Sequence, residues 1–277
     1  MASIVGEEPE WDAPLRLLGG LHFLVLAGDA TWDDPVETHA EFLRDFVREQ
    51  SVQTNEVQRS WVLLPCFLRA AQLLGVDELD VVELGPSAGL NLVWDGYCYS
   101  YEAGDWGPAD ALLRLTGEER SRVPAALLDL TPRVVRRVGI DLAPIDVTTD
   151  EGARLLECFV WAGQDERLER LTRAIYVVRA NPPELVRGDL ARELPNVLRD
   201  HPTLVFETAA FPYVSDETRA AVRDALGRAA APLAFVTAGR PRGDGQGWGM
   251  RLETYPGGER QFVGHADFHG AWLDYTF

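Results

Sequence analysis

The N-terminal third of the chain shows the apolar periodicity of helices. Residues 14–27 are almost entirely apolar, which predicts a well-buried helix. Over residues 35–48, apolar side chains recur at spacings of three and four, which predicts a helix with one buried stripe. A third helix is expected from about Thr54 to Leu74, with Gly75 as its C-terminal stop. We therefore expect a helical cap over residues 1–78.

From residue 79 onward, short apolar runs alternate with helical segments. Strands are predicted at Leu79–Leu84, Val134–Ile140, Leu185–Val186, Leu204–Phe206 and Leu233–Thr237. Helices are predicted from Leu90, from a capping box at Thr148 and Glu151 to about Trp161, over 164–180, and over 215–229. This alternation is typical of a doubly wound, mostly parallel sheet. A turn at Thr254–Gly258 predicts an antiparallel terminal hairpin, so residues 79–277 should form an α/β domain.

Residues 97–132 interrupt the alternation and are interpreted as an insertion between the first helix and the second strand. Four aromatic residues open this segment: Tyr97, Tyr99, Tyr101 and Trp106. They fit either a substrate lid or a packed cluster beneath a long loop, and the sequence does not decide between the two.

Charge narrows the range of partners. The 277 residues carry a formal net charge of −18, and all 26 basic side chains are arginines. Nucleic-acid affinity comes largely from basic contacts to phosphates, and anionic membranes attract basic segments, so neither is expected as a partner. Small-molecule ligands remain open, including cationic ones such as sulfonium compounds.

The three cysteines are far apart and form no disulfide framework or zinc motif, so no metal site is predicted. We find neither a signal peptide nor an apolar stretch long enough to span a membrane. A cytoplasmic bacterial protein is expected, and its oligomeric state is not predicted.

The strongest local motif is the glycine-rich turn from Gly85 to Gly89, directly after the first strand. A dinucleotide fingerprint does not fit it, because glycines are missing where Ser87 and Leu90 stand. The turn does match the Gly-x-Ser-x-Gly elbow of serine hydrolases, in which Ser87 would be the nucleophile. Against this, the preceding residues are helical rather than strands, and the carboxylate of Glu83 would disfavour an anionic intermediate nearby.

Carboxylates recur at the ends of successive predicted strands. They are Glu83, Asp141, Asp189 and Glu207. Ligands of open α/β sheets bind at the carboxyl ends of strands. Carboxylates there accept hydrogen bonds from ribose hydroxyls, an adenine amino group or an ammonium group, and they attract a sulfonium cation. The pattern therefore favours a cofactor site.

These segments resemble two known families. Glu83–Asn91, Gly139–Pro144, Gly188–Leu190 and Leu204–Tyr213 resemble successive motifs of class I S-adenosylmethionine-dependent methyltransferases. Three stretches resemble an uncharacterised family of bacterial proteins over nearly the whole chain: Gln53–Glu56, Gly89–Leu92 with Trp94 and Asp95, and Gly139–Asp141.

The first resemblance implies S-adenosylmethionine as cofactor. Its binding residues would be Glu83, Gly85, Ser87, Gly89, Asn91, Asp141, Leu142, Asp189, Leu190 and Thr208. By position, Asp141 would hold the ribose hydroxyls and Leu142 would pack on adenine. Asp189 and Leu190 would contact the adenine edge.

Methyl transfer from a sulfonium is an in-line displacement, so the enzyme mainly supplies orientation, and it needs a base only when the acceptor holds its proton tightly. The candidate catalytic residues are Glu207, Tyr213, Asn55 and Arg59. Methyl transfer to a small molecule is thus the leading hypothesis. A serine hydrolase using Ser87 and a non-catalytic cofactor-binding or scaffold protein are the alternatives.

Overall fold

The computed structural model describes residues 11–53, 55–161, 163–241 and 247–276. The chain divides into two compact units: Met1–Asn55 with Asp146–Ile175, and Glu56–Ile145 with Tyr176–Phe277. This division differs from the expected boundary after residue 78. Helix α4 (Arg59–Leu74) belongs to the second unit, because its apolar surface packs against the strands of that unit.

The first unit is helical. It contains α2 (Ala13–Ala27), η1 (Val36–His39), α3 (Ala40–Glu49), α6 (Asp150–Glu157) and the start of α7 (Asp165–Ala180). The predicted apolar stripe is confirmed, since Leu43 and Val47 of α3 are buried against α2. The predicted capping box is off by one residue: the N-cap of α6 is Thr149, whose Oγ1 accepts a hydrogen bond from the Gly152 amide at 3.1 Å, while Thr148 bonds to Asp146.

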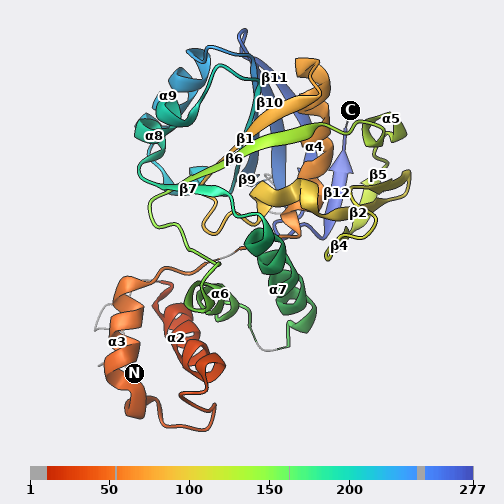
Figure 1. Cartoon of the computed structure of the whole chain (residues 1–277). Coiled ribbons are helices and arrows are strands. Elements are labelled where there is room, and N and C mark those ends of the chain that lie inside the picture. Colours follow the sequence, from red (N-terminus) through yellow and green to blue (C-terminus); the bar gives the residue numbers. More distant parts are fainter. Residues whose placement is uncertain (1–10, 54, 162, 242–246, 277) are drawn as a thin grey trace. The chain divides into compact units, whose positions relative to one another are not determined.

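The second unit is built on a nine-stranded sheet (Figure 1). Its strands are β1 (Glu78–Leu84), β5 (Glu118–Ser121), β6 (Arg133–Asp141), β7 (Glu184–Arg187), β8 (Thr203–Thr208), β9 (Leu233–Pro241), β10 (Trp248–Tyr255), β11 (Glu259–Ala266) and β12 (Trp272–Tyr275). The spatial order is β5-β12-β11-β10-β9-β8-β1-β6-β7. Strands β7-β6-β1-β8-β9 are parallel, and β9 to β12 are antiparallel. The α/β prediction, with a mostly parallel sheet and an antiparallel terminal hairpin, is confirmed.

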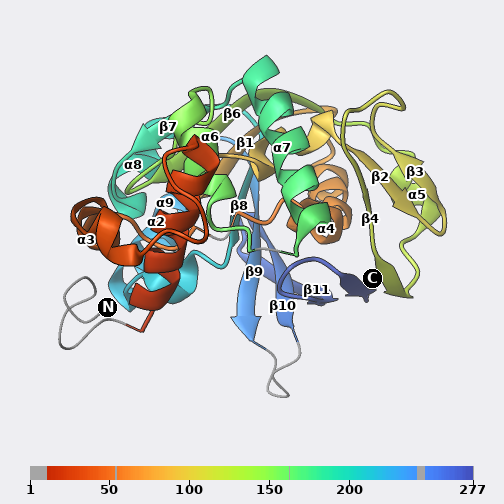
Figure 2. The same cartoon turned by 90° about the horizontal axis from the view of Figure 1, so that it is seen from below.

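Different helices cover the two faces of this sheet (Figure 2). Helices α8 (Leu190–Val197) and α9 (Asp216–Gly227) share one core cluster with β1, β6, β8 and β9. On the other face α4 packs against β8, β9 and β10, where the rings of Phe67 and Phe206 lie 4.9 Å apart. No helix within the described part of the chain combines the length and apolarity needed to cross a membrane.

The segment after β1 departs from the expected helix. The helix predicted from Leu90 is a 3₁₀ helix, η2 (Asn91–Gly96), in which Val93 has non-helical dihedral angles. The chain then forms a small sheet of β2 (Cys98–Tyr101), β3 (Gly104–Trp106) and β4 (Arg114–Thr116), followed by β5 and α5 (Ala125–Leu128). Its aromatic residues are packed: Tyr101 stacks on Trp61 at 5.2 Å and Trp106 on Trp94 at 5.4 Å. The structure therefore shows a packed cluster.

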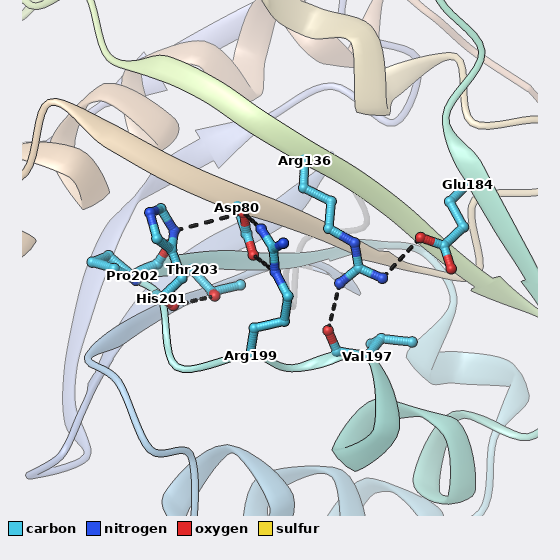
Figure 3. A network of polar contacts seen from close by, with 8 residues as sticks. All are labelled: Asp80, Arg136, Glu184, Val197, Arg199, His201, Pro202 and Thr203. Atoms are coloured by element: carbon cyan, nitrogen blue, oxygen red, sulfur yellow. Dashed lines mark hydrogen bonds and ion pairs between the residues drawn. The ribbon is translucent and has the colours of Figure 1, made fainter.

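The amino edge of the sheet is fixed by ion pairs (Figure 3). The guanidinium of Arg199 donates two hydrogen bonds to the Asp80 carboxylate, at 2.7 and 2.8 Å, although the Asp80 side chain is only 4% exposed. Nearby, Arg136 bonds to the carbonyl of Val197 and to Glu184. The Arg199 contacts tie the loop between α8 and β8 to β1, and the Arg136 contacts tie β6 to the end of α8 and the start of β7.

We predict that Arg199→Met lowers the free energy of unfolding by about 2 kcal/mol, because a nearly buried carboxylate loses its bidentate partner. Arg133→Met is the matched control. It removes an ion pair to Glu78 at the same edge in which both side chains are exposed, so a loss below about 0.5 kcal/mol is expected. Urea denaturation followed by tryptophan fluorescence measures both, and equal losses would contradict the assignment.

Candidate functional site

The carboxyl ends of three neighbouring strands meet at one edge of the sheet. Strand β1 lies between β6 and β8, and its last residue, Leu84, stands in register with Ile140 on one side and Glu207 on the other. The loops that follow these strands therefore lie together. A Cβ atom placed on Gly85, after β1, would lie 2.7 Å from the Cβ of Ala210, after β8. Only a glycine leaves room for this contact.

The glycine-rich turn has a left-handed backbone at three positions: φ is 75° at Gly85, 53° at Ser87 and 73° at Gly89. Asp141 holds the turn in place, since its Oδ2 accepts a hydrogen bond from the Ser87 amide and its Oδ1 accepts one from the Ala143 amide, each at 2.9 Å. The predicted proximity of this acid to the glycine turn is thus present. Its carboxylate links the loop after β1 to the loop after β6.

Glu83 is buried beside this turn, with 2% of its surface exposed. Its neighbour Asn91 accepts a hydrogen bond from the Ser60 hydroxyl at 2.7 Å. Among the described residues, the Oε2 atom of Glu83 has no hydrogen-bond partner. Burial raises the pKa of Glu83 to about 8, and the negative charge of Asp141 adds to the rise, while Arg59 and Asn91 oppose it. A buried carboxyl with an open acceptor is a place to bind a donor.

Glu207 occupies the other face of the sheet at the same edge. Side chains in register point to the same side, so Glu207 lies with Leu84 and α9, opposite to Glu83. Its Oε2 accepts hydrogen bonds from the amides of Ala210 and Phe211, at 3.1 and 3.2 Å. Burial raises the pKa of Glu207 to about 7, against the lowering effects of those amides and of Arg223 and Arg59. A carboxyl of this kind is suited to accept a proton near neutrality.

Arg59, at the start of α4, interacts electrostatically with both buried carboxyls. Its Nε donates to the carbonyl of Phe268 at 3.0 Å, and its guanidinium lies 4.9 Å from the Trp248 ring centroid. The predicted helix start at Thr54 falls outside the described residues, and α4 begins only at Arg59. Asn55, the candidate named together with Arg59, belongs to the other compact unit.

The remaining predicted residues differ in exposure and in local contacts. Leu142, directly after β6, is 70% exposed, and Tyr213, in the 3₁₀ helix η3 (Phe211–Tyr213) that follows β8, is 83% exposed. Thr208 is buried as the last residue of β8. Asp189 and Leu190 have structural roles that account for them: the Asp189 carboxylate caps α8 by accepting from the amides of residues 191 and 192, and Leu190 is part of the core.

Sequence reasoning missed four arginines that line a pocket beside Glu207. They are Arg219, Arg223, Arg251 and Arg260. Arg219 and Arg223 are four residues apart on a predicted helix, and this spacing could have indicated that their side chains lie on one face of it. The other two lie on β10 and β11. The turn at residues 254–258 predicted that these two strands form a hairpin, but the sequence did not specify that β10 pairs with β9.

We predict that Glu83→Gln removes a pH dependence of stability. In the folded protein the Glu83 carboxyl keeps its proton up to about pH 8, whereas its ordinary value is 4.5. Between these values the folded state binds the extra proton, so the free energy of unfolding falls as pH rises, by at most about 1.4 kcal/mol per pH unit. The stability of Glu83→Gln relative to the wild type should therefore increase from pH 5 to pH 8.

Glu78→Gln, an exposed position on the same strand, is the matched control and should track the wild type over this range. Chemical denaturation at each pH measures all three proteins. A constant difference between Glu83→Gln and the wild type would show that the carboxyl is ionised throughout.

A search of the curated proteins finds no match to this chain. One family model does match, over residues 1–275. This match confirms the resemblance to an uncharacterised bacterial family that the sequence motifs indicated. The chain belongs to the family described as "Uncharacterized protein conserved in bacteria (DUF2332)".

Proposed function

We propose that this protein binds S-adenosylmethionine at the carboxyl edge of β1, β6 and β8 and transfers its methyl group to a small molecule. The observation that carries the proposal is Leu142, an apolar side chain 70% exposed directly after Asp141 at the end of β6. It stands where the methyltransferase resemblance expects the adenine ring to pack. An exposed leucine at that edge provides an apolar surface for a flat ring.

The polar groups at this edge fit the rest of the cofactor. The open Oε2 of Glu83 is an acceptor for an ammonium group. Each Asp141 oxygen accepts one backbone N–H, and each retains a further lone pair for a ribose hydroxyl. The parallel order β7-β6-β1-β8-β9 has its switch point between β1 and β8, where ligands of open α/β sheets bind.

The bound cofactor would supply an electrophilic methyl group on a positively charged sulfur. The residues of the chain would orient the two reactants and keep water away from them. In their ionised forms the buried carboxyls Glu83 and Glu207 would favour a cation at this edge, and a bound cation would in turn lower the pKa of both. Glu207, with a pKa of about 7, would take the proton that an acceptor hydroxyl, amine or thiol releases.

We predict that S-adenosylhomocysteine binds in isothermal titration calorimetry and that Leu142→Asp weakens the binding about tenfold or more, since it removes an apolar contact and adds a charge. Leu112→Asp, at a leucine 61% exposed in the insertion, is the matched control and should bind as the wild type does. Because both leucines are exposed, neither change should disturb the fold. Absence of binding at about 1 mM would contradict the proposal.

One observation favours the serine hydrolase as a second candidate. Ser87 has a left-handed backbone, with φ at 53°, as a sharp strand-to-helix elbow requires. Two features weigh against this function. The Ser87 amide already donates to the Asp141 carboxylate, and the carboxyl of Glu83 lies nearby.

A fluorophosphonate probe tests this candidate. Under the methyltransferase proposal, we predict that the wild-type protein and Ser87→Ala show the same background labelling. Labelling that disappears in Ser87→Ala would support the hydrolase. A protein that neither labels nor binds S-adenosylhomocysteine would fit the non-catalytic alternative.

A further inference from the structure

A pocket of about 630 Å³ opens on the α9 face of the sheet, beyond the edge of α9 and over β9, β10 and β11. Its volume lies within the range of small-molecule sites. Glu207 lies in its lining, and Phe211 and Pro212 of η3 (Phe211–Tyr213) add apolar surface. All the lining residues that the structure describes belong to the second compact unit.

Four arginines supply most of the charge of this lining. Arg219 and Arg223 come from α9, Arg251 from β10 and Arg260 from β11. Among the described residues, the carboxyls of the lining are Glu207 and Asp216. The formal net charge of the chain is −18, so this excess of arginine is opposite in sign to the protein as a whole.

The buried carboxylate of Glu253 partly neutralises the charge of two of these arginines. Glu253 of β10 is 2% exposed, and its Oε1 lies 2.8 Å from the Nε of Arg260 and 3.6 Å from Arg223. Arg219 pairs with Asp216 and donates to the carbonyl of Phe211. These contacts hold three guanidinium groups in place around the pocket.

Two arginines of this lining have donors that no described residue engages. The half-buried side chain of Arg251 has neither a hydrogen bond nor an ion pair with any residue that the structure describes. The Nε of Arg223 is buried and likewise lacks a hydrogen-bond partner among the described residues. The buried Nε of Arg223 and the guanidinium of Arg251 can therefore donate to an acceptor that enters the pocket they line.

We propose that this pocket binds a small organic anion, whose carboxylate or phosphate group is held by Arg251 and Arg223 while the rest of the molecule lies along Phe211 toward Glu207. Guanidinium groups bind both kinds of oxyanion through paired N–H donors. The further step, that this anion is the methyl acceptor, rests on the proposed function. The binding of the anion to the pocket does not depend on that function.

Isothermal titration calorimetry with inorganic pyrophosphate and with succinate tests the two chemistries separately. We predict that at least one binds with Kd below about 10 mM, and the better probe identifies the class of oxyanion. Arg251→Gln should weaken that binding about tenfold or more. Arg251→Lys keeps the positive charge but lacks the paired N–H donors of the guanidinium, so it should weaken the binding less. The unfolding midpoint of each variant shows that the fold is kept.

Arg228→Gln is the matched control, because it removes the same charge from the exposed end of α9, where Arg228 lies 4.0 Å from Asp224. It should leave the binding unchanged. Equal weakening by Arg228→Gln and Arg251→Gln would overturn the site and indicate nonspecific attraction, as would failure of both anions to bind.

Titration of S-adenosylhomocysteine into the same samples separates the two proposals. Anion binding without S-adenosylhomocysteine binding would remove the methyltransferase and leave the pocket. The converse would remove the pocket alone.

Discussion

The candidate site depends on the register of one strand. Strand β1 is buried at six of its seven residues and is paired with β6 and β8 along nearly its whole length. Because side chains alternate along a strand, this register sends Glu83 to the α4 face and Leu84 to the α8–α9 face. A slip of one residue would exchange them and bury a carboxyl in the main apolar core. The apolar neighbours of Leu84 in that core therefore help to fix the position of Glu83.

The two buried carboxyls lie at one edge but differ in environment. Glu207 receives two backbone amides from its own turn, whereas one oxygen of Glu83 has no partner among the described residues. Burial raises the pKa of both, and the balance with Arg59 leaves each near the physiological range. Pairs of titratable groups whose environments differ in this way are typical of functional sites.

Much of the fold could be predicted because it is encoded locally. Short apolar runs and the turn at residues 85–89 identified the parallel strands and the loop that joins them. The pairing of Asp141 with the Ser87 amide could not be predicted, since it depends on how tightly two loops approach. The sequence places helix α4 with the N-terminal helices because they are neighbours along the chain. Neighbourhood in the sequence, however, does not reveal which surface an apolar helix packs against. The arginine pocket was missed for a related reason: its residues come from α9, β10 and β11, and only the antiparallel order of the last strands brings them together.

Glu207 connects the two proposed sites, and this has an electrostatic consequence. Arg223 and Arg59 lower the pKa of Glu207 against the effect of burial. An anion bound to Arg223 would neutralise part of that positive charge and so strengthen the affinity of the carboxylate for a proton. A cation at the carboxyl edge would act in the opposite direction. A bound anion and a bound sulfonium would thus exert opposing influences on one carboxyl, which would keep its pKa close to the value at which proton transfer is efficient. If both proposals hold, Glu207 belongs to the cofactor edge and to the lining of the anion pocket, and this shared position would couple the charge of either ligand to the protonation of its carboxyl.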